Sequence, residues 1–242
     1  MAHTEKDIRG LQEPVLLALE TATMCGSVAI VTGSRCVAEI SLQTGETHSR
    51  RLLAGIDRLL QETAVTWTDI DGIAVSLGPG SFTGLRIGLA TAKGLAMSAG
   101  VKLIGIGTLD GLAAQLFGAG DILICPVLDA RKKEVYCAFY RCDPQGMPKL
   151  QGEYQVMAPE ILCGKIAGPV IMLGDGTSVY GDLFREKLAA GLMVPPAGAY
   201  FPRAASIGML ALDKWQKKEF LEPATAEPIY IRPSEAELLF GK

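Results

Sequence analysis

The residue types that carry out catalysis are few and scattered in this chain of 242 residues. Its two histidines, His3 and His48, form no His-x-x-x-His pair of the kind that holds a metal ion on one helix face. The Gly-x-Ser-x-Gly turn of serine hydrolases is absent, and residues 80–86 lack the lysine that completes a phosphate-binding loop. The sequence therefore predicts no catalytic residue, no metal site and no cofactor.

Cysteine is the remaining reactive residue type, and its spacing does not indicate metal binding. None of the six cysteines lies in a Cys-x-x-Cys pair, and several lie in apolar runs, where cysteine packs as a small hydrophobic residue. Reduced cysteines in a cytoplasmic protein are predicted, and disulfides are the weaker alternative. The six are Cys25, Cys36, Cys125, Cys137, Cys142 and Cys163.

Composition and charge indicate a folded protein without a strong electrostatic preference. Hydrophobic residues make up 49% of the chain and charged residues 20%, which is typical of globular domains. The net charge is −3, so the basic excess of a protein that grips nucleic acid alone is missing, and such contact would be shared with a partner. No apolar run approaches the ~18 residues of a membrane span, so no membrane association is predicted.

Hydrophobic periodicity predicts strands that lead into helices, the pattern of an α/β protein, with a new unit starting near residue 122. The predicted strands are residues 15–20, 27–32, 36–42, 72–77, 101–106, 122–128, 134–141 and 170–173. The predicted helices are residues 48–64, 83–99, 109–117, 178–190 and 203–218, with a further helix after Pro233.

The predicted helix 83–99 is the most informative element. Gly84, Gly88 and Ala92 fall on one stripe, where small side chains allow a second helix to approach closely. Only Arg86 and Lys93 are charged, and a helix that is apolar nearly all round is buried nearly all round. Two interpretations follow. The helix lies in the centre of the core, or one side packs on its own sheet and the other on a second protein.

The predicted helix 48–64 strengthens the second interpretation, because it presents an apolar face next to that helix. Each leucine or isoleucine that a partner buries there would contribute about 1.5–3 kcal/mol. Two neighbouring helices of this kind form half of a four-helix interface.

From residue 15 onward the sequence resembles the TsaB (YeaZ) family of bacterial tRNA threonylcarbamoyladenosine biosynthesis proteins. The block at 78–88 is highly specific to that family, and the other segments support it. The matching segments are LALETATMCGSVAI at 17–30, THSRRLL at 47–53, GPGSFTGLRIG at 78–88, LDAR at 128–131, EVY at 134–136 and LGDG at 173–176.

The resemblance implies an α/β protein with the two-lobed actin/Hsp70/sugar-kinase-like (ribonuclease H-like) fold. Residues 1–14 are then a flexible extension, residues 15–108 and 220–242 form the first lobe, and residues 109–219 form the second. It further implies a non-catalytic scaffold that forms a heterodimer with the catalytic paralogue TsaD and a ternary complex with the ATPase TsaE. Transfer RNA is contacted through that complex, and the chain forms a homodimer when alone.

The resemblance also implies that the two helices form the TsaD-facing surface. The residues predicted at this partner interface are Ser49, Leu52, Leu53, Ile56, Leu60, Thr83, Leu85, Arg86, Ile87, Ala90, Thr91 and Met97.

The first strand-turn departs from the family pattern. Residues 20–23 are Glu-Thr-Ala-Thr, where the family usually has Asp-Thr-Ser-Thr, which argues against independent ATP hydrolysis. Two turns remain as vestigial nucleotide contacts, Glu20 with Thr21 and Gly174 with Asp175 and Gly176, although a plain strand-to-helix turn explains the second equally well. An ATP-binding small-molecule kinase of the same fold is the alternative function, and a metallopeptidase is the weakest one.

Overall fold

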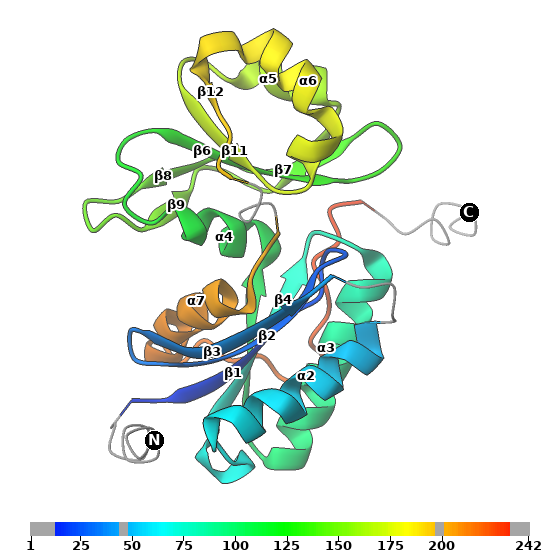
Figure 1. Ribbon diagram of the computed structural model, residues 1–242, viewed down its shortest axis with the longest axis vertical. Helices are drawn as coiled ribbons and strands as arrows, with labels where there is room; N and C mark the ends of the chain where they lie inside the picture. Colours follow the sequence, from blue (N-terminus) through cyan, green and yellow to red (C-terminus); the bar gives the residue numbers. More distant parts are fainter. Residues whose placement is uncertain (1–12, 44–47, 197–200, 233–242) are drawn as a thin grey trace. The chain divides into compact units, whose positions relative to one another are not determined.

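The computed structural model of the chain describes residues 13–43, 48–196 and 201–232, without the side chains of residues 48–51 (Figure 1). The chain divides into two compact units. The first contains the residues up to 107 together with 203–228, and the second contains 108–202 together with the segment that begins at 229. The predicted extension at 1–14 and the predicted helix after Pro233 lie mainly outside the described residues.

The first unit is built on a five-stranded sheet in the order β3-β2-β1-β4-β5. The first three strands form an antiparallel meander, and β4 and β5 continue the sheet parallel to β1. The strands are β1 (Val15–Glu20), β2 (Gly26–Thr32), β3 (Arg35–Leu42), β4 (Gly72–Gly78) and β5 (Lys102–Gly107).

Helices cover both faces of this sheet (Figure 1). On one face α2 (His48–Thr63) and α3 (Phe82–Ala99) pack against Leu17 and Leu19 of β1, and on the other α7 (Ala204–Gln216) packs against Leu16 and Ala18. Alternate residues of a strand point to opposite faces, so β1, buried at every position, contributes to both cores.

The position of α7 corrects the predicted lobe boundary. The sequence places residues 203–219 in the second lobe, but Ile207 and Ala211 lie in the core of the first unit. An added Cβ at Gly208 would lie 2.7 Å from a methyl group of Val31, so glycine allows the close approach of α7 to β2. Periodicity marks the apolar side of a helix but does not tell which sheet that side covers.

The second unit is built on a seven-stranded sheet with the path β10-β7-β6-β11-β12, and β8 joins it beside β6 and pairs with β9. Its strands are β6 (Leu123–Asp129), β7 (Val135–Cys137), β8 (Tyr140–Cys142), β9 (Pro148–Leu150), β10 (Gln155–Met157), β11 (Val170–Leu173) and β12 (Leu192–Met193). Its α-helices among the described residues are α4 (Thr108–Ala113), α5 (Pro159–Lys165) and α6 (Gly176–Leu188), and its short 3-10 turns lie at Ala114–Leu116 and Ala189–Gly191. A further 3-10 turn, Trp67–Asp69, belongs to the first unit.

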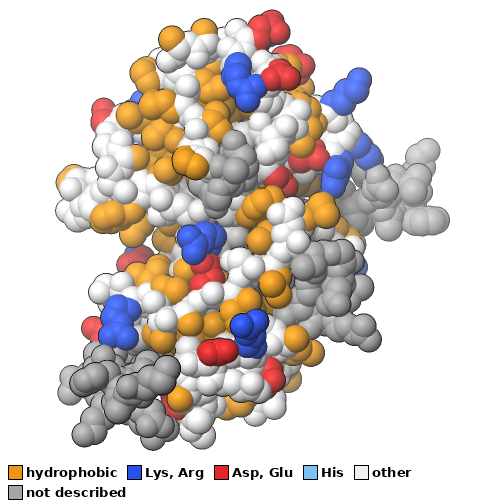
Figure 2. All heavy atoms as spheres, in the orientation of Figure 1, with side chains coloured by type: hydrophobic (Ala, Val, Ile, Leu, Met, Phe, Trp, Pro, Cys, Tyr) orange, Lys and Arg blue, Asp and Glu red, His pale blue; other side chains and the backbone are white. Residues whose placement is uncertain are grey.

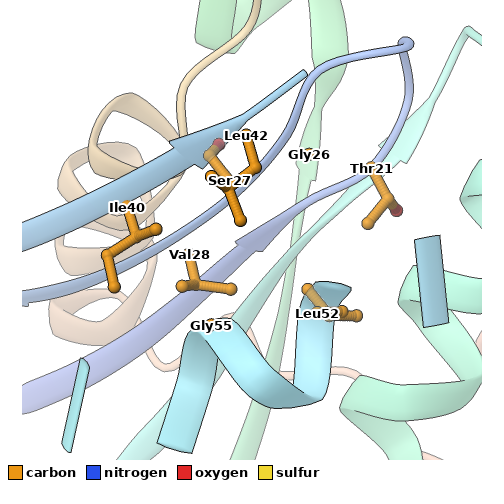
Figure 3. A pocket seen from close by; sticks show the side chains of 8 residues that line it. All are labelled: Thr21, Gly26, Ser27, Val28, Ile40, Leu42, Leu52 and Gly55. Atoms are coloured by element: carbon orange, nitrogen blue, oxygen red, sulfur yellow. The ribbon is translucent and has the colours of Figure 1, made fainter. Parts of the chain in front are cut away.

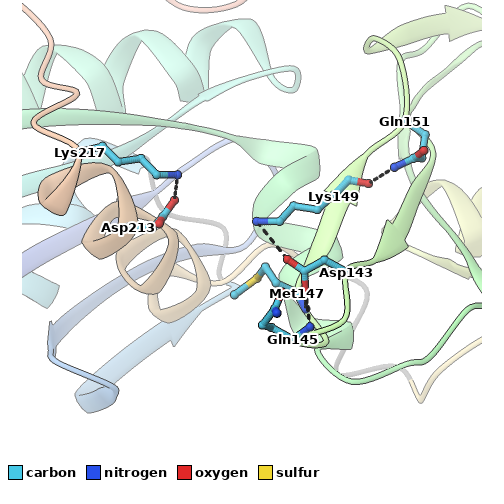
Figure 4. A network of polar contacts seen from close by, with 7 residues as sticks. All are labelled: Asp143, Gln145, Met147, Lys149, Gln151, Asp213 and Lys217. Carbon is cyan, nitrogen blue, oxygen red and sulfur yellow. Dashed lines mark hydrogen bonds and ion pairs between the residues drawn. The ribbon is translucent and has the colours of Figure 1, made fainter.

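Hydrogen bonds to aspartate carboxylates stabilise the loops of the second unit. Asp110 accepts hydrogen bonds from the hydroxyls of Tyr140 (2.7 Å) and Tyr154 (2.6 Å). In the β8–β9 turn, Asp143 Oδ1 accepts hydrogen bonds from the backbone N–H groups of Gln145 (3.0 Å) and Met147 (2.9 Å) (Figure 4). These bonds lower the pKa of Asp143, because they favour its charged form.

Most predicted elements are confirmed within a residue or two, and the exceptions lie in the second unit. The predicted strand 134–141 consists of two strands, β7 and β8, because the first pairs with β10 and the end of β6 while the second pairs with β9 and Ile124. Strands β9, β10 and β12 and helix α5 were not predicted. Each has seven residues or fewer, too short for a clear period.

Candidate functional site

Helix α3 has well-defined ends, within one residue of the predicted bounds 83–99. The Ser81 hydroxyl accepts a hydrogen bond from the backbone N–H of Gly84 (3.3 Å), which satisfies one of the unpaired donors of the first turn. Gly100 ends the helix in the left-handed conformation (φ 69°), which glycine adopts without strain. Between these residues lie 18 helical residues that cover one side of β4.

The small-residue stripe of α3 faces inward, onto the turn that follows β1. The Thr21 hydroxyl donates a hydrogen bond to the Gly84 carbonyl (2.8 Å). A Cβ at Gly84 would lie 2.1 Å from the Thr21 carbonyl oxygen, and one at Gly88 would lie 2.1 Å from the Thr21 hydroxyl. The stripe therefore serves packing within the chain. The group that approaches it is the turn after β1, and not the second helix that the sequence predicts.

The opposite side of α3 is exposed and almost uncharged. Met97 is 69% exposed and Phe82 is 38% exposed. The one charged side chain on this side of the helix is Arg86. Its guanidinium lies over the Phe82 ring, 3.8 Å from the ring centre, an arrangement in which the ring attracts the cation. We define the outward face of α3 as six of its exposed residues, which lie on the side opposite the small-residue stripe: Phe82, Thr83, Arg86, Ala90, Gly94 and Met97.

Lys93, the other charged residue of α3, is half-buried. Its ammonium donates hydrogen bonds to the carbonyl oxygens of Ala226 (3.0 Å) and Ala224 (3.5 Å), in the segment that follows α7. These two hydrogen bonds engage the ammonium group of Lys93 within the first unit.

Helix α2 lies beside α3 and is amphipathic (Figure 1). Leu52, Ile56 and Leu59 are buried against β2 and β1 in the core of the first unit. The exposed side carries charged residues such as Arg58 and Glu62, which form an i,i+4 ion pair at 3.9 Å, but also Leu53, whose side chain is 54% exposed.

The structure separates the twelve residues predicted at the partner interface into four groups. Ser49 lies outside the described side chains. Leu52, Ile56 and Leu85 are at most 4% exposed, so the prediction that they line an accessible surface is wrong. They lie on the apolar side that the sheet covers. Those half-buried are Leu60, Ile87 and Thr91, and those exposed are Leu53, Thr83, Arg86, Ala90 and Met97.

Phe82 and Gly94 are exposed residues of α3 that the predicted partner interface does not include. The sequence contained a signal for Gly94. A glycine inside a helix lowers the stability of the helix by about 0.5–1 kcal/mol relative to alanine, so its presence suggests a role other than helix formation. An added Cβ at Gly94 meets nothing within 4 Å in the chain.

A shallow hollow lies between α2 and the β2–β3 hairpin (Figure 3). The residues that line it include Leu52 and Gly55 of α2 and Val28 and Ile40 of the hairpin, and none is charged. An added Cβ at Gly55 would lie 3.2 Å from a methyl group of Val28, so glycine brings the helix close to the sheet here. The lining therefore supplies no cationic side chain to pair with a phosphate group.

The first predicted nucleotide contact, the turn after β1, is buried. One carboxylate oxygen of Glu20 is bonded within the chain, and the other, Oε2, has no hydrogen-bond partner among the described residues. Glu20 is fully buried, and its carboxylate accepts a hydrogen bond from the backbone N–H of Ala22 (2.5 Å). Burial raises the pKa of Glu20 to about 7, although this bond, the Ser76 hydroxyl and the N–H of Thr21 partly offset the effect. Neither Glu20 nor Thr21, which is 1% exposed, presents its side chain to solvent.

The second predicted contact, at the start of α6, has the geometry of a tight strand-to-helix junction. A Cβ at Gly174 would lie 2.2 Å from the carbonyl oxygen of Val127, and its φ is 110°. The Asp175 carboxylate accepts a hydrogen bond from the backbone N–H of Asp129 (3.0 Å), and burial raises its pKa. These contacts account for Gly174 and Asp175 without a ligand. A vestigial nucleotide contact stays a prediction.

The described residues contain no group of three or more His, Cys, Asp or Glu side chains that could hold a metal ion. All six cysteines are free thiols. No helix within the described ranges is long and apolar enough to cross a membrane. Figure 2 shows one face of the molecule, on which Lys and Arg side chains are scattered among acidic and hydrophobic ones.

Two sheets, each with parallel strands and covering helices, define an α/β protein of the actin/Hsp70/sugar-kinase-like (ribonuclease H-like) fold, which confirms the predicted fold class. The family model described as TsaD, tRNA N6-adenosine threonylcarbamoyltransferase, matches residues 42–239. The solved structure of YeaZ from Pseudomonas aeruginosa is similar with a TM-score of 0.76 and 29% identity, over 90% of this chain and 100% of that one.

Curated relatives cover nearly the whole chain. The TsaB protein of Escherichia coli is 32% identical over 225 residues, which are 91% of this chain and 96% of that protein. The TsaB protein of Bacillus subtilis is 29% identical over 225 residues, 92% of this chain and 96% of that protein. The chain belongs to the TsaB (YeaZ) family.

Proposed function

We propose that the chain is a non-catalytic subunit in the formation of threonylcarbamoyladenosine in tRNA, and that it docks on a TsaD-type subunit. The names of its relatives, tRNA threonylcarbamoyladenosine biosynthesis proteins, support the process. The internal bonds of Thr21 and Asp175 support a non-catalytic role, because the Thr21 hydroxyl and the Asp175 carboxylate are already engaged within the chain.

The observation that carries the docking proposal is the outward face of α3. Phe82, Ala90, Gly94 and Met97 are exposed on one helix, and Leu53 is exposed on the adjacent α2. Apolar side chains on a surface gain about 25 cal/mol per Å² when a partner covers them. Small residues between them let the partner backbone come close, and the guanidinium of Arg86 supplies a charged contact at the edge.

One partner surface serves the assembly that we propose. When a TsaD-type subunit is present, the chain forms a heterodimer with it through the outward face of α3 and the exposed part of α2. When that subunit is absent, two copies of this chain pair through the same residues. A TsaE-type ATPase joins as a third component, and tRNA is contacted by the assembled complex. The chain acts in the cytoplasm.

Aspartate substitutions on the exposed residues test this proposal. Met97→Asp and Leu53→Asp place a charge where the partner would bury it, and an unpaired buried charge is strongly unfavourable. We expect each to abolish co-purification with a TsaD-type subunit while circular dichroism and melting temperature stay unchanged, because both side chains are more than half exposed.

Val179→Asp is the matched control, since Val179 is 57% exposed on α6 of the second unit. It should leave co-purification intact. Retention of the partner by both Met97→Asp and Leu53→Asp would show that docking uses another surface.

The kinase alternative gains no support from the described contacts, because its two candidate turns are engaged within the chain. Calorimetry of the chain with ATP and Mg²⁺ distinguishes the two functions. A subunit of the kind proposed here should show no tight binding and no turnover.

A further inference from the structure

The carboxyl group of Glu20 is buried at the end of β1 and is only partly bonded. The side chain is fully buried, and Oε1 accepts a hydrogen bond from the backbone N–H of Ala22 (2.5 Å). The other oxygen, Oε2, has no hydrogen-bond partner among the described residues. A carboxylate that loses its water needs hydrogen bonds in its place, so an unbonded oxygen makes the charged form unfavourable. The surroundings of Glu20 therefore fit a protonated carboxyl better than an ionised one.

A serine in the neighbouring strand compensates the charge of Glu20 only in part. Strands β1 and β4 are parallel and pair Leu19 with Val75, so Glu20 and Ser76 are the next positions along the two strands. Ser76 is fully buried as well. Its hydroxyl favours the carboxylate and lowers the pKa of Glu20, but burial outweighs this effect and raises that pKa to about 7. The carboxyl therefore changes its charge near neutral pH.

The charged residues around Glu20 are engaged elsewhere. The flanking strands β2 and β4 contain no acidic or basic residue. The nearest ionisable group along the chain, the thiol of Cys25, is buried too. Charged side chains of the elements on the two faces of the sheet have partners of their own among the described residues: Asp57 with Gln61, Arg58 with Glu62, Arg86 with the Phe82 ring, Lys93 with two backbone carbonyls, Arg203 with Glu39, Asp213 with Lys217, and Lys214 with the Gly105 carbonyl.

The two residues after Glu20 hold the start of α3. The Ala22 carbonyl accepts a hydrogen bond from the backbone N–H of Ser81 (2.7 Å), the residue that caps the helix. The Thr21 hydroxyl donates to the Gly84 carbonyl (2.8 Å). Ala22 thus bonds to the Glu20 carboxyl through its N–H and to the helix cap through its carbonyl. A short chain of hydrogen bonds therefore links Glu20 to the first turn of α3.

We propose that Glu20 is a positioning residue that makes docking of the partner subunit depend on pH, by way of the turn after β1 and the start of α3. This inference rests on the proposed function, in which the outward face of α3 binds a TsaD-type subunit. A protonated Glu20 keeps the turn closed. When the proton passes to water, the carboxylate gains hydration only if the turn moves. That movement displaces the first turn of α3, where Phe82 and Thr83 belong to the outward face.

The size of the effect follows from the protonated fraction of Glu20. With a pKa of about 7, roughly 90% of the chains are protonated at pH 6 and roughly 10% at pH 8. The apparent Kd is inversely proportional to the fraction that is competent to bind. Docking through the protonated form alone therefore raises the Kd about tenfold between pH 6 and pH 8.

Binding of a TsaD-type subunit at pH 6, 7 and 8 and constant ionic strength tests the proposal. The variant E20Q keeps the size of the side chain and cannot ionise. It should bind as the unaltered chain does at pH 6 and equally tightly at pH 8. The matched control is H48Q, because histidine has an ordinary pKa of about 6.5 and His48, the first residue of α2, lies in the same pH range. H48Q should keep the tenfold change. A tenfold change that persists in E20Q, or one that disappears in H48Q, would overturn the proposal.

A second variant gives a readout that a purely structural role of Glu20 would not change. S76A removes a hydroxyl that favours the carboxylate, so it should move the midpoint of the docking curve to higher pH. Melting temperatures of all variants, followed by circular dichroism at both ends of the range, show that the compared chains are folded. An S76A midpoint that stays in place or moves to lower pH would contradict the role of Glu20.

Amide hydrogen exchange in the isolated chain separates this inference from the proposed function. The Ser81 N–H, which is bonded to Ala22, should exchange faster at pH 8 in the unaltered chain than in E20Q, and at the same rate in both at pH 6. This pattern without any docking would refute the proposed function and still support the coupling of Glu20 to α3. Equal exchange in both chains at pH 8 would refute the coupling.

Discussion

Three glycines of α3 give the sharpest test of this structure, because the same change to alanine should have opposite effects along one helix. At Gly84 the new Cβ would lie 2.1 Å from the carbonyl oxygen of Thr21. At Gly88 it would lie 2.1 Å from the Thr21 hydroxyl. At Gly94 it would meet nothing within 4 Å.

The magnitudes follow from these distances. An ordinary contact requires more than 3 Å, so Gly84→Ala must move the backbone after β1 by about 1 Å, and such overpacking costs about 1–3 kcal/mol. Displacement of Thr21 weakens its buried hydrogen bond to Gly84, which adds about 1 kcal/mol. Gly94→Ala instead stabilises an exposed helix position by about 0.5–1 kcal/mol.

Thermal unfolding of the purified variants, followed by circular dichroism, measures the difference. About 2–4 °C per kcal/mol is expected for a chain of this size. Gly84→Ala and Gly88→Ala should therefore melt roughly 5–15 °C lower, and Gly94→Ala about 1–4 °C higher. A neutral or stabilising Gly84→Ala or Gly88→Ala would show that α3 does not pack on Thr21.

Gly94→Ala also reports on docking. Since its Cβ meets nothing in the chain, weaker binding of a TsaD-type subunit by this more stable variant would have to arise at the interface.

Two further predictions concern buried residues of the first unit. Burial raises the pKa of Glu20 from 4.5 to about 7, so the folded state favours the protonated carboxyl. The stability that this proton contributes is fully present below about pH 4.5 and is lost as the pH rises to about 7. The loss amounts to about 3 kcal/mol. Glu20→Gln should remove this pH dependence, and urea unfolding at pH 5 and pH 8 checks it. An unchanged pH profile would contradict the assignment. Ile56→Asp should unfold the first unit rather than release the partner selectively, because Ile56 is 3% exposed and an unpaired buried charge costs several kcal/mol. A folded Ile56→Asp variant would refute its place in the core.

The sequence alone determined local structure and family. The period of the apolar residues predicts a helix at 83–99, which matches α3 almost to the residue, because this period depends on near neighbours in the chain. The block at 78–88 points to the TsaB (YeaZ) family, and the relatives confirm it. The small number of residues of catalytic types was also evident from the sequence alone.

Tertiary structure decided what each face of a helix touches. Small residues at Gly84 and Gly88 suggest close approach, yet only the coordinates show that the approaching group is Thr21 of the same chain. Leu52 and Ile56 are apolar in the sequence whether a sheet or a partner covers them, and here the sheet does. The strained backbone of the turn between β6 and β7 left no trace in the sequence pattern. Its left-handed backbone at Arg131, Lys132 and Lys133 opposes local preference and depends on contacts from Asp175 and Arg232, which lie far along the chain.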